Sequence, residues 1–350
     1  MKTICVETSK SYQVHIGHNL LLQAGEFLKP VCTPCKAAII SDSNVYPLYG
    51  KKLEDSLTAS GYTVINYVFP AGESSKNGTT YLSILNFLAE NEITRSDVLI
   101  ALGGGVVGDI TGFAAATFLR GISYVQIPTS LLAMVDSSIG GKTAIDLPAG
   151  KNLVGAFYQP SLVICDLTTL NTLSKEIFLD GCAEVIKYGV LFDAELFEHL
   201  WKNGPLFDRE SVIAQCVTLK RNVVKEDEFD TGIRQMLNLG HTVGHAIEKI
   251  SDYTISHGKA VAIGMAIIAK AASETGLCDR SVCDRICKIL KLFSLPTSTD
   301  YSLEALYSGL LTDKKRSLDT LNIIVPQEIG QCSIRKYHTY DVKSFIKAGL

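Results

Sequence analysis

The stretch DVLIALGGGVVGDITG (97–112) decides the fold class of the first half of the chain. Residues 97–104 form a short apolar run, which predicts a buried strand, and residues 108–119 have the spacing of a helix. The three glycines at 103–105 let the backbone approach a ligand, and the helix N-terminus that follows offers free N–H groups to a phosphate. The glycine spacing departs from a strict G-x-G-x-x-G pattern, so a tight turn without a ligand stays an alternative to a dinucleotide site.

The alternation of strands and helices continues on both sides of this stretch. Short apolar runs rich in β-branched residues predict further buried strands at 36–42, 63–69, 122–129 and 161–167. Helical spacing occurs at 47–60, 78–91 and 108–119. This alternation favours a mostly parallel sheet that is covered by helices on both faces. The first residues, MKTICVETSKSYQVHIG (1–17), alternate apolar and polar side chains and predict one more strand.

The second half of the chain is predicted to be mostly helical. Segments with helical spacing are 175–190, 194–202, 209–226, 241–250, 259–276 and 279–292. Only LNIIVP (321–326) resembles a strand. The change of pattern predicts an N-terminal α/β domain at 1–172 and an α-rich C-terminal domain at 173–350.

The composition argues against several classes of protein. Hydrophobic residues make up 47% of the 350 residues and charged residues 20%, which suits a large folded core and not a disordered chain. The formal net charge of −3 gives no reason to expect a nucleic acid or a membrane surface as partner. No run of about 18 apolar residues suggests a membrane span. Ten scattered cysteines suit reduced thiols, so we expect a soluble, cytoplasmic protein.

Histidines and a carboxylate in the second half have the composition of a metal site. His241 and His245 in NLGHTVGHAIE are four residues apart, so a helix would present both imidazoles on one face. His257 precedes a glycine at an apparent helix start. Glu184 stands among apolar residues in GCAEVIKYG, three before Lys187, and a salt bridge between these two is the alternative to metal ligation. One carboxylate and two imidazoles, with a position left open, make up a catalytic zinc site.

Cations lie in glycine-rich segments of the first half. In MVDSSIGGKTAIDLPAGKNLVGAFYQP (134–160), Lys142 and Lys151 stand near glycine turns, with Asn152 beside the second lysine. Such lysines suit phosphate or carboxylate ligands, although a solvated loop with ordinary surface lysines is the alternative. AGESSKN (71–77) follows a strand and is a weaker candidate for binding phosphate. The residues alone predict an enzyme that binds a dinucleotide, a divalent metal and an anionic substrate.

Several blocks in the same order closely resemble the 3-dehydroquinate synthase family: GGGVVGDITGF, RGISYVQIPTSLLAMVDSSIGGKTAID, GKNLVGAF, AEVIKYG, NLGHTVGHAIE and HGKAVAIGM. The resemblance implies a Rossmann-like N-terminal domain, a helical C-terminal domain and a homodimer. It also implies NAD and a divalent metal as cofactors, with zinc expected and cobalt as the alternative. The implied activity belongs to the shikimate pathway and converts a phosphorylated sugar acid, 3-deoxy-D-arabino-heptulosonate 7-phosphate, into 3-dehydroquinate and phosphate.

The reaction implied by the resemblance leaves NAD unchanged after each turnover. Transient oxidation by NAD at C5 acidifies the proton on C6, phosphate leaves by β-elimination, the hydride returns, and an intramolecular aldol step closes the ring. In the family, an oxygen of the substrate phosphate takes the C6 proton. No dedicated protein base is therefore expected.

Matching positions carry the site residues of the family onto this chain. The metal ligands would be Glu184, His241 and His257, whereas His245 would lie near the substrate phosphate. The residues that would act in catalysis are Lys142, Lys187, Lys220, Arg234, Asn238 and His245. Those that would bind NAD are Asp42, Asn44, Glu73, Lys76, Gly104, Gly105, Asp109, Thr129, Ser130, Lys142, Lys151 and Thr172. Those that would bind the substrate are Arg120 of the partner subunit, Asp136, Lys142, Asn152, Lys220, Arg234, Asn238 and Lys314, with Lys315 as the alternative to Lys314.

Three other functions stay open at this point. A metal-dependent polyol dehydrogenase, such as glycerol dehydrogenase, would bind an uncharged diol and would not need so many site cations. Another sugar phosphate cyclase, such as 2-deoxy-scyllo-inosose synthase, would take glucose 6-phosphate, which has no carboxylate to match Arg234 and Asn238. A non-catalytic NAD-binding sensor would have no use for a complete set of metal ligands.

Overall fold

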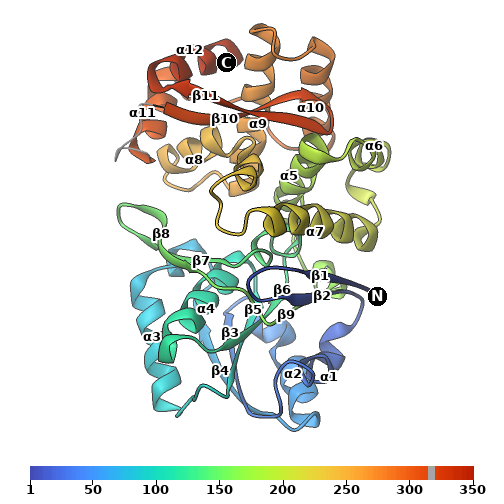
Figure 1. Cartoon of the computed structure of the whole chain (residues 1–350), viewed down its shortest axis with the longest axis vertical. Coiled ribbons are helices and arrows are strands. Elements are labelled where there is room, and N and C mark those ends of the chain that lie inside the picture. Colours follow the sequence, from blue (N-terminus) through green and yellow to red (C-terminus); the bar gives the residue numbers. More distant parts are fainter. Residues whose placement is uncertain (314–319) are drawn as a thin grey trace. The chain divides into compact units, whose positions relative to one another are not determined.

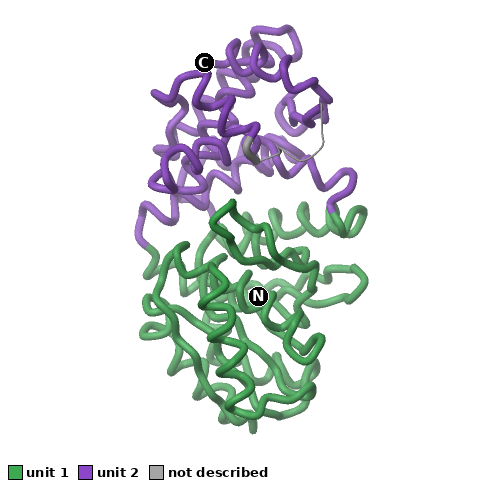
Figure 2. Tube along the Cα trace, turned by 90° about the vertical axis from the view of Figure 1, so that its left-hand side faces the viewer, with its two compact units in different colours: residues 1–173, 209–229 green, residues 174–208, 230–350 purple. Residues whose placement is uncertain are grey.

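The computed structural model describes residues 1–313 and 320–350, and the chain divides into two compact units, which Figure 2 colours separately. Unit 1 comprises residues 1–173 and 209–229, and unit 2 comprises residues 174–208 and 230–350. The sequence pattern predicts a second domain that contains every residue after 172. The structure differs in one segment, 209–229, which belongs to unit 1.

Helix α7 (Arg209–Glu226) accounts for that difference. It packs against β1 (Lys2–Val6) and β2 (Tyr12–Gly17), and its buried side chains include Val217 and Val224. Helical spacing predicted the helix itself with the same bounds. Spacing does not show which core an apolar stripe enters, and this is why the segment was placed in the other domain.

A seven-stranded sheet forms the centre of unit 1 (Figure 1), with the order β1-β2-β9-β6-β5-β3-β4. The remaining strands are β3 (Lys36–Asp42), β4 (Thr63–Phe69), β5 (Val98–Gly103), β6 (Ser123–Pro128) and β9 (Leu162–Asp166). Every neighbouring pair is parallel except β1 and β2. The predicted mostly parallel sheet is confirmed, whereas the single strand expected at 1–17 is an antiparallel pair.

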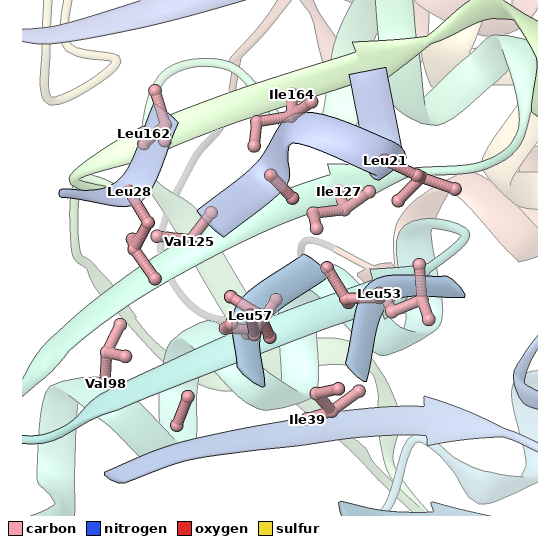
Figure 3. Packing of buried hydrophobic residues seen from close by; sticks show 14 of the residues in the cluster. Leu21, Leu28, Ile39, Leu53, Leu57, Val98, Val125, Ile127, Leu162 and Ile164 are labelled. Atoms are coloured by element: carbon pink, nitrogen blue, oxygen red, sulfur yellow. The ribbon is translucent and has the colours of Figure 1, made fainter. Parts of the chain in front are cut away.

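Helices cover both faces of this sheet. Besides α7, the α-helices of unit 1 are α1 (Ala24–Leu28), α2 (Tyr46–Ala59), α3 (Gly78–Glu90) and α4 (Gly105–Thr117), and short 3₁₀ helices lie at Leu20–Gln23, Glu73–Ser75, Phe118–Arg120 and Leu167–Asn171. Ile39 of β3 belongs to the core on the side of α1 and α2, and its neighbour Ile40 to the core on the side of α3 and α4. Figure 3 shows the first of these, where Leu53 and Leu57 lie among strand residues such as Val125. Burial on both faces explains why the strands are continuous apolar runs.

The order of the strands creates a switch point between β3 and β5. These two strands are parallel neighbours, but β3 is followed by β4 on one side and β5 by β6 on the other. In open α/β sheets, ligands bind outside the carboxyl ends of the strands at such a point. The segments that follow Asp42 and Gly103 are therefore the expected position of a cofactor.

A two-stranded sheet occupies part of the segment 134–160, where the sequence predicted only lysines near glycine turns. A π-helical turn (Ala133–Ser137) precedes the antiparallel strands β7 (Lys142–Leu147) and β8 (Gly150–Phe157). The middle of β8 is exposed on both faces, so its apolar and polar residues do not alternate. Without that alternation the period-two signal of a strand is missing.

In the residues that the structure describes, unit 2 consists of helices and one hairpin (Figure 1). Its helices are α5 (Lys175–Phe192), α6 (Ala194–Asn203), α8 (His241–Ile250), α9 (His257–Glu274), α10 (Arg280–Leu292), α11 (Leu303–Asp313) and α12 (Thr339–Gly349), with 3₁₀ helices at Gly204–Leu206 and Ile233–Asn238. Helix α9 is buried along most of its length and packs against α5, α8, α10 and α12. The helix-rich second part predicted from the sequence is confirmed.

The hairpin of unit 2 pairs β10 (Thr320–Glu328) with β11 (Gln331–His338). The sequence predicted one strand here, and β11 was missed because its residues are mostly exposed and polar. Helices α11 and α12 were also not predicted. Across the described ranges, the structure contains no helix with the length and apolarity needed to cross a membrane.

Asp97 ties together the starts of the two strands at the switch point. Its Oδ1 accepts the backbone N–H of Lys36 at 2.9 Å, and its Oδ2 accepts the backbone N–H and the hydroxyl of Thr94, each at 2.7 Å. Burial alone would raise the pKa of Asp97, but these bonds from Thr94 and Lys36 lower it overall. A lowered folded-state pKa means that the carboxylate stabilises the fold above its unfolded pKa of about 3.9, and that this stabilisation is lost as the pH falls through the folded value.

We therefore expect Asp97→Asn to lower the free energy of unfolding by about 1–2 kcal/mol at pH 7, because an amide has one accepting oxygen instead of two, so either Lys36 or Thr94 loses its acceptor. The difference from wild type should shrink as the pH is lowered below about 4. Urea unfolding followed by circular dichroism at pH 7 and pH 4 measures both. An equal midpoint at pH 7 would contradict the role assigned to this carboxylate.

Candidate functional site

Three side chains of unit 2 form a group that can hold a metal ion. Glu184 comes from α5, and His241 and His257 are the first residues of α8 and α9. The Nε2 atoms of both histidines lie 3.3 Å from Oε1 of Glu184. Ligand atoms of the three residues all lie within 4.8 Å of one another. One carboxylate oxygen and two imidazole nitrogens suit zinc or a similar divalent ion, so this donor set fits the metal that the sequence predicted.

Close approach of three helix backbones brings these donors together. Gly240 has a φ of 78° and separates the 3₁₀ helix Ile233–Asn238 from α8, so that His241 begins a new helix. A Cβ on Gly264 of α9 would lie 2.0 Å from the carbonyl oxygen of Gly240. A Cβ on Gly258 would lie 2.0 Å from the carbonyl oxygen of Asp180 on α5. Side chains at these glycines would push α5, α8 and α9 apart.

Asp180 also fixes where α9 begins. Its Oδ1 accepts the hydroxyl of Ser256, the N-cap residue of α9, and the backbone N–H of Lys259 at 3.0 Å. The carboxylate thus accepts one of the free N–H groups of the first turn. Its negative charge also interacts favourably with the positive end of the helix dipole. His257 is the first residue of that turn. By fixing the start of α9, Asp180 therefore helps to fix the position of His257 relative to Glu184.

The second ring nitrogen of each histidine faces an acceptor. His241 Nδ1 lies 3.1 Å from the carbonyl oxygen of Leu239, and His257 Nδ1 lies 3.3 Å from Oε2 of Glu248. An acceptor at Nδ1 favours the tautomer that carries its proton there and leaves the lone pair on Nε2. Both imidazoles therefore present Nε2 toward Glu184.

Charges around Glu184 set the protonation states of the group. Burial would raise the pKa of Glu184, but Lys187, His241 and His257 hold it well below its usual range. Burial and Lys187 lower the pKa of His241. Burial would lower the pKa of His257, but the carboxylates of Glu184 and Glu248 raise it to about 10. The ionised carboxylate and the neutral His241 are the forms that bind metals, and a metal ion would replace the proton on His257.

Other predicted site residues of unit 2 lie close to this group in the chain or in space. Lys187, which is 1% exposed, forms an ion pair with Oε2 of Glu184. His245 is exposed, and its ring centroid lies 5.4 Å from that of His241 and 6.3 Å from that of His257. Arg234 is 2% exposed, and Asn238 is exposed at the end of the same 3₁₀ helix. The salt bridge and the metal donor set, which the sequence left as alternatives, both occur at Glu184.

The predicted cofactor residues of unit 1 follow the carboxyl ends of the parallel strands. Asp42 ends β3, Gly104 follows β5, and Thr129 follows β6. Asn44, Glu73, Lys76, Gly105, Asp109, Ser130 and Thr172 lie in the segments that continue from the ends of these strands and from β4 and β9. The backbone N–H of Thr129 donates to the carbonyl of Gly103 at 2.9 Å, which joins two of these segments. This is the edge of the sheet at which the switch point lies.

Helix α4 presents its N-terminus to this edge without a side-chain cap. Its N-cap residue is Gly104, and its first turn carries no acidic residue. A Cβ on Gly104 would meet its nearest neighbour, Ser130 Oγ, at 3.6 Å. Uncapped N–H groups and a backbone without a side chain suit a pyrophosphate, so the residues present fit a dinucleotide.

Lys76 is a buried cation that connects three segments of this edge. It is 5% exposed, and its ammonium lies 2.6 Å from Oδ2 of Asp109 on α4 and 2.6 Å from Oδ1 of Asn152 on β8. Burial would lower the pKa of Lys76, but Asp109 and Glu73 raise it, so the ammonium stays charged. Lys151, beside Asn152, pairs with Glu73 at 3.2 Å. Lys76, which is predicted to bind NAD, thus directly contacts Asn152, which is predicted to bind the substrate phosphate.

The remaining predicted substrate residues of unit 1 lie near the hairpin and α7. Lys220 of α7 is 5% exposed and donates to the carboxylate of Asp136 and, at 2.6 Å, to its backbone carbonyl. Lys142 is exposed at the start of β7. Arg120 is exposed after α4. Lys314 and its alternative Lys315 lie outside the described residues.

The carboxylates of Glu248, Asp180 and Asp146 also contact these groups, and the sequence did not predict a role for them. Glu248 faces His257, and Asp180 caps α9. Asp146 accepts the backbone N–H of Asn152 at 2.8 Å, and its own N–H donates to the carbonyl of Lys76 at 2.8 Å. Glu248 stands seven residues after His241, two helical turns along the same face, and that spacing was a signal that could have pointed to it.

Two family models match consecutive parts of the chain. The model described as 3-dehydroquinate synthase N-terminal matches residues 66–180, and the model described as 3-dehydroquinate synthase C-terminal matches residues 181–316. Together they cover more than half of the sequence. The chain belongs to the 3-dehydroquinate synthase family. It is therefore an enzyme, as the sequence predicted.

Individual members and neighbours of the 3-dehydroquinate synthase family match along the whole chain. A 3-dehydroquinate synthase from Clostridium acetobutylicum is 44% identical over 354 residues, which cover 99% of this chain and 99% of the relative. The structure of 2-deoxy-scyllo-inosose synthase complexed with carbaglucose-6-phosphate, NAD+ and Co2+ has a TM-score of 0.89 at 25% identity and covers 100% of both chains. The structure of 2-epi-5-epi-valiolone synthase from Streptomyces hygroscopicus subsp. jinggangensis, with NAD+ and Zn2+ bound, has a TM-score of 0.89 at 26% identity and covers 99% of this chain and 97% of that one.

We expect His257→Ala to abolish retention of zinc, because two protein ligands rarely hold a catalytic zinc ion. The measurement is the zinc content of purified protein by mass spectrometry after dialysis against a chelator. His199→Ala, which removes an exposed histidine on α6 of the same unit, is the matched control and should keep its zinc. A folded His257→Ala protein that kept its zinc would show that the donor set is wrong.

Proposed function

We propose that the chain is a 3-dehydroquinate synthase, which converts 3-deoxy-D-arabino-heptulosonate 7-phosphate into 3-dehydroquinate and phosphate. The observation that carries the proposal is the 44% identity to a relative of that name along 99% of both chains. The reaction oxidises one alcohol of the substrate, eliminates phosphate, reverses the oxidation and closes a ring by an aldol step. It ends without net oxidation or reduction.

The proposed cofactors are NAD and a divalent metal, with zinc as the first choice and cobalt as the alternative. Solved neighbours that carry NAD+ with Co2+ or Zn2+ support this, as do the donor set at Glu184 and the uncapped N-terminus of α4. When bound, NAD supplies a reversible hydride acceptor and the metal supplies a Lewis acid for the alcohol that is oxidised. Glu184, His241 and His257 would hold the metal.

Side chains of unit 2 would bind the acidic end of the substrate. The guanidinium of Arg234 can donate two parallel N–H bonds to a carboxylate, with Asn238 donating beside it. Arg234 is 2% exposed, and in such a position a bond to an anion is stronger than in water. Lys187 pairs with Oε2 of Glu184, which leaves Oε1, the oxygen that faces both histidines, to bind the metal.

Side chains of unit 1 would bind NAD and the phosphate group. Lys76 occupies the side-chain oxygen of Asn152, which leaves the amide nitrogen of Asn152 to donate to a phosphate oxygen. Lys142 would add a point charge to the same group. Fixing the phosphate in this way also fixes its oxygens near the proton that must be removed, and so the elimination needs no separate protein base.

A homodimer in the cytoplasm is part of the proposal. The segment that would reach the neighbouring subunit has an unusual backbone, because Leu119, Arg120 and Gly121 have φ values of 50°, 67° and 120° in succession. Positive φ values at residues other than glycine cost about 1–3 kcal/mol each and persist where the structure needs a particular geometry. This supports a specific use for Arg120.

The alternatives differ in substrate and in products. A polyol dehydrogenase would bind an uncharged diol as substrate, whereas the buried Arg234 and Lys187 together with Lys142 and Lys220 suit an anionic substrate. The two solved cyclases, one of them complexed with carbaglucose-6-phosphate, are 25–26% identical to this chain, well below the 44% of the synthase relative. A sensor without activity is inconsistent with family membership. The synthase is the function best supported.

The proposal predicts release of phosphate from 3-deoxy-D-arabino-heptulosonate 7-phosphate with a trace of NAD and added zinc. Phosphate should exceed the NAD supplied many times over, while absorbance at the NADH band does not accumulate. NADH that rises with turnover would instead indicate a dehydrogenase. Phosphate release from glucose 6-phosphate alone would indicate a sister cyclase.

Lys142→Ala is expected to raise the KM for the sugar phosphate about 10- to 100-fold, because a charge-assisted bond contributes about 1.5–3 kcal/mol. The Kd for NAD, measured by titration, should change much less. Lys2→Ala, which removes an exposed lysine from β1 of the same unit, is the control. Equal losses of both affinities would rule out a phosphate-binding role for Lys142.

A further inference from the structure

We propose that Glu248 is a positioning residue for the metal centre. Its carboxylate accepts the Nδ1–H of His257 and so presents Nε2 of that imidazole to the metal, next to Glu184 and His241. The inference rests on the metal centre of the proposed function and deepens it. Glu248 is not one of the ligands that the sequence or the family resemblance assigned.

The imidazole of His257 lies between two carboxylates. Its Nε2 is 3.3 Å from Oε1 of Glu184, and its Nδ1 is 3.3 Å from Oε2 of Glu248. A neutral imidazole has one N–H and one lone pair, so its two nitrogens cannot serve the same purpose. With the proton on Nδ1 facing Glu248, the lone pair of Nε2 points to the donor group; the opposite tautomer would place a proton where the metal binds.

The partner of His257 differs in kind from that of His241. His241 Nδ1 faces a backbone carbonyl, that of Leu239, whereas His257 Nδ1 faces a carboxylate. A carbonyl orients the ring, but a carboxylate also makes the imidazole a stronger donor to a metal. Glu248 is 3% exposed, so water screens this interaction little. Helix α8 thus supplies one metal ligand itself and orients the ligand that comes from α9.

A competing role for Glu248 is direct ligation. His245, Glu248 and His257 form a second group whose ligand atoms lie within 4.8 Å of one another. A metal there would need Nδ1 of His257, and a nitrogen that donates its proton to Glu248 cannot also bind a metal. The positioning role is favoured because Nε2 of the same ring already faces the buried Glu184, which is 0% exposed, and His241. The two roles predict different numbers of bound ions.

The test measures zinc binding by metal-stripped protein, with a chromophoric chelator as competitor and no substrate. Glu248→Ala should weaken the zinc Kd by about 10- to 100-fold, and Glu248→Gln, which keeps an acceptor without the charge, should lie between wild type and Glu248→Ala. Glu195→Gln, an exposed position on α6, is the matched control and should not change the Kd. Wild type should bind one zinc ion per chain.

Several outcomes decide the question. A graded loss of affinity in proteins whose thermal midpoints at saturating zinc match wild type supports the positioning role. Unchanged zinc affinity in the folded variants, or two zinc ions in wild type with one lost in Glu248→Gln, overturns it. If Glu248→Ala does not fold, the isosteric Glu248→Gln decides alone. Because no substrate is used, a failure of the synthase reaction is recognised separately.

Discussion

The buried carboxylate of Glu184 is the interaction on which the arrangement of unit 2 depends. A carboxylate that is 0% exposed is costly to bury unless other groups balance it. Lys187 balances one oxygen, and His241 and His257 face the other. Those partners come from different helices, so α5, α8 and α9 must converge closely. The same convergence places one carboxylate oxygen and two imidazole nitrogens together, which is why the need to pair the charge and the capacity to bind a metal coincide.

In unit 1 the buried charge is positive, and it also brings together segments that are distant in the sequence. Lys76 is a buried ammonium, and its partners are Asp109 on α4 and Asn152 on β8. The hairpin of β7 and β8 is held against the sheet's carboxyl edge by these bonds and by the backbone bond between Asp146 and Lys76. In each unit, one buried charge draws together segments that are distant in sequence, and the candidate ligand-binding residues surround it.

The sequence predicted the regular framework well, because burial leaves a clear pattern. The strands at 36–42 and 63–69 and the helix at 209–226 have the predicted bounds. The exposed strand β11 was missed, since exposed residues carry no periodic constraint. The spacing from His241 places Glu248 on the same face of α8, but it does not show that Glu248 and Asp180 act on α9, because their distances to that helix depend on how the helices pack. Helix α7 shows a related limit. Its residue pattern predicted where the helix begins and ends, but not that it packs into the core of unit 1.

Unit 1 is formed by two separate segments of the chain, and this affects how it can fold during synthesis. Unit 1 lacks one of its helices until residue 229 has left the ribosome, although its sheet is complete by residue 173. Until then, the sides of β1 and β2 that α7 covers stay open to water. At about 5–20 residues per second, this interval lasts a few seconds. The first helices of unit 2, α5 and α6, are made during that time, so unit 1 cannot finish folding until part of unit 2 has been synthesised.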